Sequence, residues 1–322
     1  MSIHVGQILR QAALRFPQTT ALLEIDEATS HEVTYAALEA DARSLSRALI
    51  DLGVAPGESV GLMAGNSARF VASWFAIIYA GCTAIPVPTR SAPREIAQRM
   101  VHSSVAVLLV DASSRATAER AAESVDMFRV VALDELWPTA GPLEGPLSAA
   151  GSVPAMVLYT SGTTGRPKGV VISHASLLCH TASLVHHTLR LTSSDRVLGV
   201  LPLTHSYGFR MTILAPFYAG GTVVLPRRFD ARSSLRLIGE EAITWVPAVP
   251  TMYAAWAEAG AEAHRVTPPA SLVWCLCAGA PLPDEVRLRA ESVLGAEIRQ
   301  GYGMTEATFS TINSPPAPRL PG

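Results

Sequence analysis

The chain has 322 residues, of which 49% are hydrophobic and 16% charged, and its formal net charge at pH 7 is -2. This length and composition predict one large or two medium globular domains with a sizeable buried core. A net charge near zero, with scattered basic residues, excludes the electrostatic footprint of a protein that binds nucleic acid or an anionic membrane surface. The 4 cysteines have no metal-ligand spacing, which indicates buried thiols in a reducing compartment.

The N-terminal region predicts helices and a short hairpin. The first sixteen residues follow an amphipathic helix pattern and contain no secretory signal. The runs 20–25 and 31–35 predict the hairpin, and evenly spaced leucines predict a helix over 36–53. The stretch 70–88 is apolar enough to suggest a membrane span, but Gly81 and two prolines interrupt it. We therefore expect a buried helix and a buried strand there, in a cytoplasmic protein with no membrane span.

Strand-like runs then alternate with helical patterns to the end of the chain. The predicted strands are 59–64, 83–88, 105–110, 129–133, 155–160, 196–201, 221–226, 243–246, 272–277 and 296–301. Helical patterns lie near 175–190, 207–219, 230–241, 250–260 and 283–294. Because a segment rich in proline and glycine, 138–154, separates two such series, we predict an α/β fold of two consecutive subdomains with mostly parallel sheets. Their expected bounds are 1–150 and 151–322, and the second contains the segments with the densest polar and glycine-rich chemistry.

Ligands of parallel α/β folds collect at the carboxyl ends of the strands. Four segments with polar or glycine-rich chemistry follow predicted strands: 160–169, 202–210, 278–283 and 300–306. We take these four segments as the candidate site.

The first segment belongs to the stretch LYTSGTTGRPKGVVISH, residues 158–174. Glycines allow backbone N–H groups to approach an anion, hydroxyls add donors, and Lys168 adds a positive charge, which together suit a triphosphate or pyrophosphate. The residues concerned are Thr160, Ser161, Gly162, Thr163, Thr164 and Gly165. The motif is not a Walker P-loop, since Gly169 follows the lysine, and no kinase motifs accompany it. The alternative is an ordinary polar turn.

The segment QGYGMTEAT carries three side chains with suitable chemistry. Tyr302 offers a flat ring for a base, Thr305 a hydroxyl for a phosphate, and Glu306 an oxygen ligand for Mg²⁺. The alternative is a junction that leads from a strand into a helix, with Glu306 in its first turn. The segment CAGAPL, 277–282, offers small residues against which a flat ring could lie, or is simply the start of a helix.

These motifs resemble those of the AMP-forming adenylate synthetases, the superfamily of acyl-CoA synthetases, nonribosomal peptide adenylation domains and luciferases. YTSGTTGRPKGV resembles the signature loop, and LPLTHSYGF, CAGAPL and QGYGMTEA resemble further family motifs in the expected order. The resemblance covers essentially the whole chain and implies the large N-terminal domain of such an enzyme. It implies Lys168, His205 and Thr305 as catalytic residues and Glu306 as the metal ligand. The implied nucleotide-binding residues are Thr160, Ser161, Gly162, Thr163, Thr164, Gly165, Gly279, Ala280, Pro281, Gly301, Tyr302, Gly303, Met304 and Thr305.

The resemblance also implies an acid substrate. Peptide-type domains place an aspartate shortly after the position of His205, whereas here Ser206 to Arg210 include no acid. This favours a carboxylic acid without a free α-amine. Arg210 could meet a second substrate carboxylate or could face solvent. The acid pocket is expected near 205–211, 249–252, 278–280 and 301–304. Several residues there are small, apolar or aromatic, which allows a medium apolar or aryl acid.

The implied reaction joins a carboxylate to the α-phosphorus of MgATP, releases pyrophosphate, and passes the acyl group to CoA or to the pantetheine of a carrier protein. The ribose-binding aspartate, the hinge and the C-terminal lid domain of the family lie beyond the motif that residues 305–307 resemble. We expect a truncated chain or a large-domain fragment. A natural half completed by another chain, and a degenerate protein that binds adenylates with little turnover, are the alternatives.

Overall fold

Buried parallel strands flanked by helices form the chain, as the alternating pattern predicts. The computed structural model describes residues 3–26, 29–137, 143, 150–160, 168–262 and 270–313. The chain divides into two units, one of Met1–Gln18 with Val33–His180 and one of Thr19–Glu32 with Thr181–Gly322. Among the described residues, no helix is long and apolar enough to cross a membrane.

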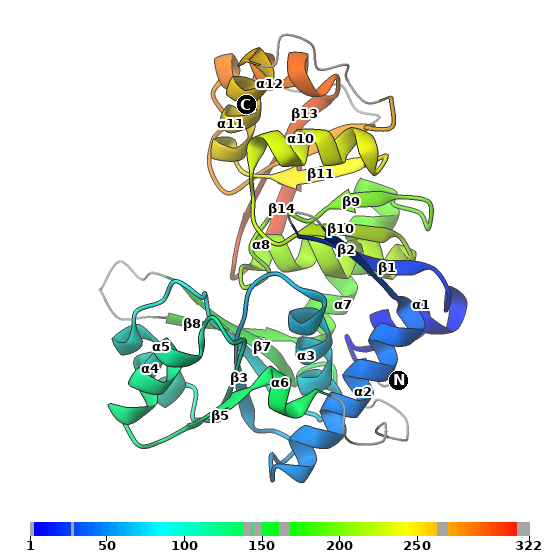
Figure 1. Cartoon of the computed structure of the whole chain (residues 1–322). Coiled ribbons are helices and arrows are strands. Elements are labelled where there is room, and N and C mark those ends of the chain that lie inside the picture. Colours follow the sequence, from blue (N-terminus) through cyan, green and yellow to red (C-terminus); the bar gives the residue numbers. More distant parts are fainter. Residues whose placement is uncertain are drawn as a thin grey trace. The chain divides into compact units, whose positions relative to one another are not determined.

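The first unit is built on a mostly parallel sheet with the strand order β6-β5-β3-β4-β7-β8, in which only the last pairing, β7 with β8, is antiparallel (Figure 1). Its strands are β3 (Ser59–Met63), β4 (Thr83–Pro86), β5 (Val105–Val110), β6 (Arg129–Ala132), β7 (Pro154–Thr160) and β8 (Lys168–Ser173). Its helices are α1 (Gln7–Arg15), α2 (Tyr35–Asp51), α3 (Ala68–Tyr79), α4 (Pro93–His102), α5 (Arg115–Glu123) and α6 (Leu133–Leu136), and α7 (His174–Ser183) follows β8.

The apolar stretch 70–88 lies inside this unit. Ser67 caps α3 by accepting a hydrogen bond from the backbone N–H of Phe70, and the helix ends just before Gly81, whose φ is 76°. Both α3 and β4 are buried. The prediction of a buried helix and a buried strand is confirmed.

The second unit has a sheet with the order β14-β13-β12-β11-β9-β10-β1-β2. Its strands are β1 (Thr20–Asp26), β2 (Thr29–Thr34), β9 (Arg196–Leu198), β10 (Thr222–Pro226), β11 (Trp245–Ala248), β12 (Trp274–Cys277), β13 (Glu297–Met304) and β14 (Thr308–Ile312). Its helices are the π-helix η1 (Leu184–Leu189), α8 (Ser206–Phe209), the π-helix η2 (Arg210–Leu214), α9 (Ala215–Ala219), α10 (Ala231–Glu240), α11 (Pro250–Glu262) and α12 (Asp284–Leu294). The β13–β14 hairpin is antiparallel, and the neighbouring strands from β13 to β1 pair in parallel.

Alternate residues of the central strands are buried on opposite faces of this sheet. Cys275 and Cys277 of β12 belong to the core that includes α10, α11 and α12, whereas Trp274 and Leu276 belong to the core that includes η1 and η2. A strand that is buried on both faces reads as a continuous apolar run, as the sequence of β12 does. The thiols at 275 and 277 are buried as expected, but Cys179 is exposed.

The units do not follow the boundary expected at residue 150. The β1–β2 hairpin belongs to the second unit, where β1 lies beside β10 (Figure 1). Leu22 of β1 is the register partner of Val223 of β10. Conversely, β7 and β8 complete the sheet of the first unit. Both departures from the expected boundary have the same cause. A strand joins the sheet whose edge offers its backbone hydrogen-bond partners, however distant that edge is in sequence.

Candidate active site

Three of the four candidate segments begin at one edge of the second unit's sheet. The parallel strands β11, β12 and β13 are in register, with Ala248 beside Cys277 and Cys277 beside Gln300. Strand β9 pairs with β11 in the same direction. The segments 202–210, 278–283 and 300–306 therefore lie at the carboxyl ends of neighbouring strands, as predicted for a ligand site.

The segment 300–306 forms a hairpin. Strand β13 continues through Met304, where the sequence predicted a loop, and it pairs with β14, with Tyr302 opposite Thr311 and a bulge between Tyr302 and Gly303. Residues 305–307 make the turn, closed by the Ala307 N–H, which donates to the Met304 carbonyl at 3.3 Å. The alternative that Glu306 sits in a first helical turn is wrong, because this backbone continues into a strand.

The side chains of this hairpin are accessible. Tyr302 is 61% exposed and Met304 47% exposed. Glu306 is exposed and Thr305 is half-buried. The hairpin therefore exposes an aromatic ring on β13 and a carboxylate in its turn, beside the half-buried Thr305.

The segment 279–281 crosses the end of β12 in an exposed loop. Gly279 has φ of 92°, a left-handed conformation that favours glycine. The Leu282 N–H donates to Oε1 of Gln300 at 3.0 Å, so the loop is fixed to the last residues of β13 before the hairpin. We did not single out Gln300, although its position directly before GYG was a usable signal.

His205 lies at the start of α8. Its Nδ1 accepts a hydrogen bond from the Tyr207 N–H at 3.3 Å, which caps the helix. Desolvation by the surrounding protein lowers the pKa of His205, although the residue as a whole is exposed. At neutral pH the imidazole is therefore uncharged, with its proton on Nε2, because Nδ1 serves as an acceptor.

Tyr207 connects the ends of the central strands. Its hydroxyl lies 3.1 Å from the Ala248 carbonyl of β11 and 2.9 Å from the Leu276 carbonyl of β12. Its ring packs edge-on against Phe309 of β14, with ring centroids 5.4 Å apart. Phe309 was not predicted to take part, although TFSTI, residues 308–312, has the β-rich composition of a strand.

An apolar cluster gathers the expected acid-binding positions. Tyr207, Met211 and Ala278 are buried in one core cluster, and Val249 and Phe309 pack against it. Gly301 lies beside Phe309, so close that an added Cβ would be 2.6 Å from the Phe309 ring. Four segments that are distant in sequence thus contribute to a single apolar region.

Arg210 is buried, so the alternative that it faces solvent is wrong. Its side chain is 1% exposed, and its Nε donates to Ser206 Oγ at 3.3 Å. Burial lowers the pKa of its guanidinium to about 10, which leaves it charged at neutral pH.

The signature segment belongs to the first unit, at the far end of the β7–β8 hairpin. Thr160, which is half-buried, is the cross-strand partner of Lys168, whose side chain is exposed. Ser161, Gly162, Thr163, Thr164 and Gly165 lie outside the described residues. Strand β7 is parallel to β4, whereas β8 returns antiparallel to β7.

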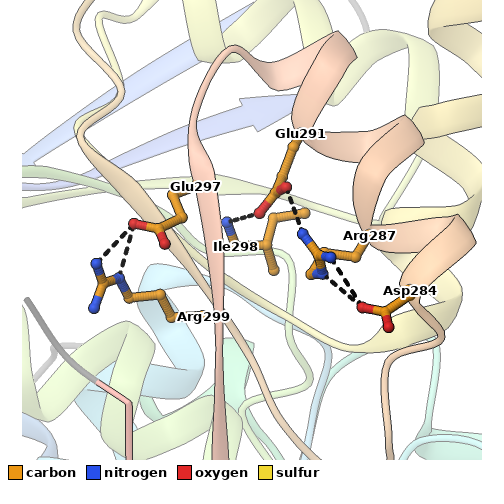
Figure 2. Close-up of polar contacts among 6 residues, drawn as sticks. All are labelled: Asp284, Arg287, Glu291, Glu297, Ile298 and Arg299. Atoms are coloured by element: carbon orange, nitrogen blue, oxygen red, sulfur yellow. Dashed lines mark hydrogen bonds and ion pairs between the residues drawn. The ribbon is translucent and has the colours of Figure 1, made fainter. Parts of the chain in front are cut away.

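A hydrogen bond joins β13 to the preceding helix α12, and ion pairs within each element accompany it (Figure 2). Glu291 of α12 accepts from the backbone N–H of Ile298 at 2.9 Å and from Arg287 Nη1 at 2.8 Å. Arg287 also donates to Asp284 at 2.9 Å, and Arg299 donates to Glu297 at 2.7 Å. Strand β13, which carries Tyr302 and leads into the turn at Glu306, is therefore held near its start by α12 as well as by its neighbours in the sheet.

No three His, Cys, Asp or Glu side chains gather among the described residues in a way that could hold a metal ion by themselves. Magnesium, however, is commonly held by one or two carboxylates together with substrate phosphates. An exposed carboxylate at Glu306, next to a hydroxyl at Thr305, fits that kind of shared coordination.

The sequence and the fold of this chain match those of known proteins. The family model described as AMP-binding enzyme matches residues 9–322. The chain belongs to this family, and the resemblance drawn from its motifs is confirmed. Its α/β architecture with two mostly parallel sheets is that of the large domain of AMP-forming ligases.

Its relatives include several CoA ligases. The chain is 29% identical to the sulfoacetate–CoA ligase of Cupriavidus necator, over 97% of this chain and 61% of that protein. It is 31% identical to a long-chain-fatty-acid–CoA ligase of Thermus thermophilus, over 95% of this chain and 58% of that protein. The crystal structure of the anthranilate CoA ligase AuaEII with anthranoyl-AMP matches with a TM-score of 0.89 and 26% identity, over 99% of this chain and 62% of that one. The chain thus spans about three fifths of the length of these relatives.

Proposed function

We propose that the chain forms the nucleotide-binding part of an AMP-forming acid–thiol ligase. Such an enzyme activates a carboxylic acid as acyl-AMP, releases pyrophosphate, and transfers the acyl group to a thiol, either CoA or the pantetheine of a carrier protein. The observation that carries the proposal is the common sheet edge, where the segments 202–210, 278–283 and 300–306 meet in a chain of the AMP-binding enzyme family.

In this proposal the second unit binds the adenylate. The exposed ring of Tyr302 stacks on the adenine. The adenine also lies against the loop of Gly279, Ala280 and Pro281, which has no bulky side chains. Gly301, Gly303 and Met304 surround the nucleotide along β13. Thr305 donates its hydroxyl to the α-phosphate, and Glu306 is the carboxylate that would hold Mg²⁺, which neutralises phosphate charge when bound.

The signature segment of the first unit would bind the phosphates that leave. Thr160 and Lys168 stand at its two ends, and Ser161 to Gly165 supply hydroxyl and backbone donors. A carboxylate oxygen of the acid attacks the α-phosphorus, the bond to the β-phosphate oxygen breaks, and pyrophosphate departs. Donors and a cation near the transferred charge are the means by which such a displacement is accelerated.

His205 is the residue that we place between acid and nucleotide. Because its imidazole is uncharged and carries its proton on Nε2, it can donate one hydrogen bond to a substrate oxygen without adding charge. The apolar cluster around Tyr207 and Met211 favours an apolar or aryl acid of medium size. The name of the long-chain-fatty-acid–CoA ligase among the relatives agrees with an apolar acid, whereas sulfoacetate, named for another relative, is strongly polar.

The first test measures adenylate binding by calorimetry. A non-hydrolysable acyl sulfamoyl adenosine, with benzoyl and hexanoyl forms as probes, should bind the chain. Replacing Tyr302 by Ala should weaken binding by roughly 5- to 150-fold, the effect of losing about 1–3 kcal/mol of base stacking, while Tyr302→Phe should bind almost as well as the parent. Failure of the parent chain to bind any probe would refute the proposal.

The second test asks about turnover. Pyrophosphate exchange into ATP, driven by a panel of carboxylic acids, is measured for this chain and for a form as long as its relatives. Exchange by the longer form and tight adenylate binding by both forms are expected. If both forms bind the adenylate and neither shows exchange with any acid, the chain is instead an adenylate-binding half with little turnover.

A further inference from the structure

The strongest feature outside the proposed contacts is the environment of Tyr159, the residue before Thr160 on β7. Three polar atoms from the C-terminal end of α4 surround its hydroxyl. His102 Nδ1 lies at 2.7 Å, Ser103 Oγ at 2.6 Å, and the hydroxyl also donates to the Arg99 carbonyl at 3.3 Å. A single phenolic hydroxyl therefore has its full hydrogen-bonding capacity used by one helix end.

The ring of Tyr159 is held as firmly as the hydroxyl. The guanidinium of Arg99 lies over it at 5.8 Å from the centroid, and the His102 ring meets it edge-on at 5.7 Å. Arg99 is itself fixed by donating from Nη1 to the buried Ser91 at 3.1 Å. Tyr159 also packs against the core cluster of the first unit that includes Ile96 of α4.

The same ring reaches across to the opposite strand. Tyr159 is the register partner of Gly169 in β8, and a Cβ added to Gly169 would lie 3.4 Å from Cζ of the tyrosine. The next pair along the hairpin is Thr160 with Lys168. Tyr159 therefore forms a bridge from the end of α4 to the residue that adjoins Lys168.

The hairpin needs such an attachment. Strand β7 is paired with β4 at Met156, near its start, and β8 is the edge strand of the sheet among the described strands. Its exposed edge includes Val171, which is 62% exposed. An edge hairpin that is held only at its base can pivot, so a second attachment one residue from Thr160 determines where its far end points.

We infer that Tyr159 is a positioning residue for phosphate binding: through the end of α4, it fixes Thr160 and Lys168 in the orientation that the nucleotide phosphates require. This inference rests on the proposed function. It assigns α4, which contributes no residue to the proposed contacts, the role of a support for Thr160 and Lys168.

The test compares Tyr159→Phe, which keeps the ring and removes the hydroxyl, with the parent chain. We expect faster hydrogen exchange at the amides of Thr160, Lys168 and Gly169, and about three- to tenfold weaker binding of MgATP in calorimetry, the effect of losing one net hydrogen bond. Ser103→Ala should show a smaller change in the same direction. Ser103→Thr, which restores a hydroxyl, should return both readouts toward the parent values.

Tyr218→Phe provides a matched control in the second unit. The Tyr218 hydroxyl also bonds a histidine ring, lying 3.1 Å from His186 Nε2, and the two rings likewise meet edge-on. This variant should leave the affinity for MgATP unchanged, and also the amide hydrogen exchange of residues 160 and 168–169.

The outcomes separate the two proposals. Unchanged amide hydrogen exchange in Tyr159→Phe would show that Tyr159 does not fix the hairpin to α4. Faster hydrogen exchange with unchanged MgATP affinity would overturn the role of Tyr159 in phosphate binding. If the parent chain binds no MgATP, the proposed function fails and the positioning role fails with it.

Discussion

Gly208 occupies a place that no other residue fits. A Cβ added there would lie 2.1 Å from the Pro202 carbonyl oxygen and 3.1 Å from the Leu201 side chain. Backbone atoms cannot move aside as the end of a flexible side chain can. The glycine thus allows α8 to pass over the segment that follows β9 and brings His205 and Tyr207 into place.

We predict that Gly208→Ala lowers the free energy of unfolding by about 1–3 kcal/mol or more, because it overpacks a buried turn. Urea denaturation measures the change. Gly239→Ala is the matched control: its added Cβ meets nothing within 4 Å on helix α10, so it should stabilise the chain by about 0.5–1 kcal/mol. Equal effects of the two substitutions would contradict the steric argument.

A buried pair of histidines ties the N-terminal segment to the end of β8 within the first unit. His4 and His174 are each 2% exposed, with ring centroids 4.5 Å apart, and His174 Nδ1 accepts from the Val5 N–H at 3.2 Å. Burial lowers the pKa of each from 6.5 to about 4, and for His174 the neighbouring His4 adds to the effect. Nearby, Tyr79 bonds to Glu39, and burial raises the pKa of that carboxyl.

The direction of the pH dependence follows from these shifts. The unfolded histidines bind protons below pH 6.5, whereas the folded ones do so only near pH 4, so stability falls as the pH drops between these values. Each histidine contributes at most roughly 3 kcal/mol to this loss. Glu39 acts in the opposite sense, because its raised pKa favours the folded state at low pH and withdraws that contribution as the pH rises.

We predict that in His174→Asn the free energy of unfolding, measured with urea, falls less steeply between pH 6.5 and 4 than in the parent. The side-chain oxygen of the asparagine can still accept from the Val5 N–H. His187→Asn, at an exposed position, should leave the curve parallel to that of the parent. Superimposable curves for His174→Asn and the parent would show that the buried pair does not control acid stability.

At the scale of an element, β13 depends on a side chain to complete its pairing. Ile298 is in register with Cys275 on one side, whereas the pairing with β14 on the other covers only Gly301 to Met304. Glu291 of α12 supplies an acceptor for the Ile298 N–H where β14 does not reach (Figure 2). The helix thereby takes the place of a strand at the base of the hairpin that carries Tyr302.

We predict that Glu291→Ala lowers the free energy of unfolding by about 1–3 kcal/mol, since it leaves a buried N–H and Arg287 without this acceptor. Glu291→Gln keeps an acceptor and should cost less. Urea denaturation and the exchange rate of the Ile298 amide are the measurements. Glu285→Ala removes only an exposed contact, 3.9 Å from Arg289, and should change stability by less than about 0.5 kcal/mol; a loss as large as that of Glu291→Ala would contradict the argument.

At the scale of the whole molecule, each unit is built from segments that lie far apart in the chain. The second unit contains β1, whose residues Leu22 to Ile25 pair with Val223 to Pro226 of β10, and Thr222 Oγ1 donates to the Thr20 carbonyl at 2.7 Å. Leu23 also belongs to the apolar core of that unit. A break in the chain between 150 and 181 therefore cannot separate the units cleanly.

We predict that residues 181–322 alone unfold at lower temperature and with less cooperativity than the same residues preceded by 19–32 through a glycine–serine linker. The added hairpin restores the strand beside β10 and covers its apolar neighbours. Thermal unfolding followed by circular dichroism compares the two fragments. Equal cooperativity and equal midpoints would show that the hairpin is dispensable to the second unit.

The sequence by itself determined the family, the α/β class and the position of most strands and helices. The signature loop and the QGYGMTEA segment are dense enough in glycine, hydroxyl and charged residues to indicate nucleotide chemistry without a fold. Buried strands such as β12 and the helix–strand pair α3–β4 were predictable because their apolar runs and their glycine and proline interruptions are local signals.

Only the tertiary structure decided how these elements are shared and supported. The sequence pattern does not predict strands β8 and β14. Both are edge strands, so their partly exposed residues lack the continuous apolar run that marks a central strand. The place of β1 beside β10, the burial of Arg210, and the attachment of Tyr159 to α4 all depend on residues distant in sequence. Local composition records what a segment can form, but which partner satisfies its hydrogen bonds and covers its apolar face is decided only when the chain has folded.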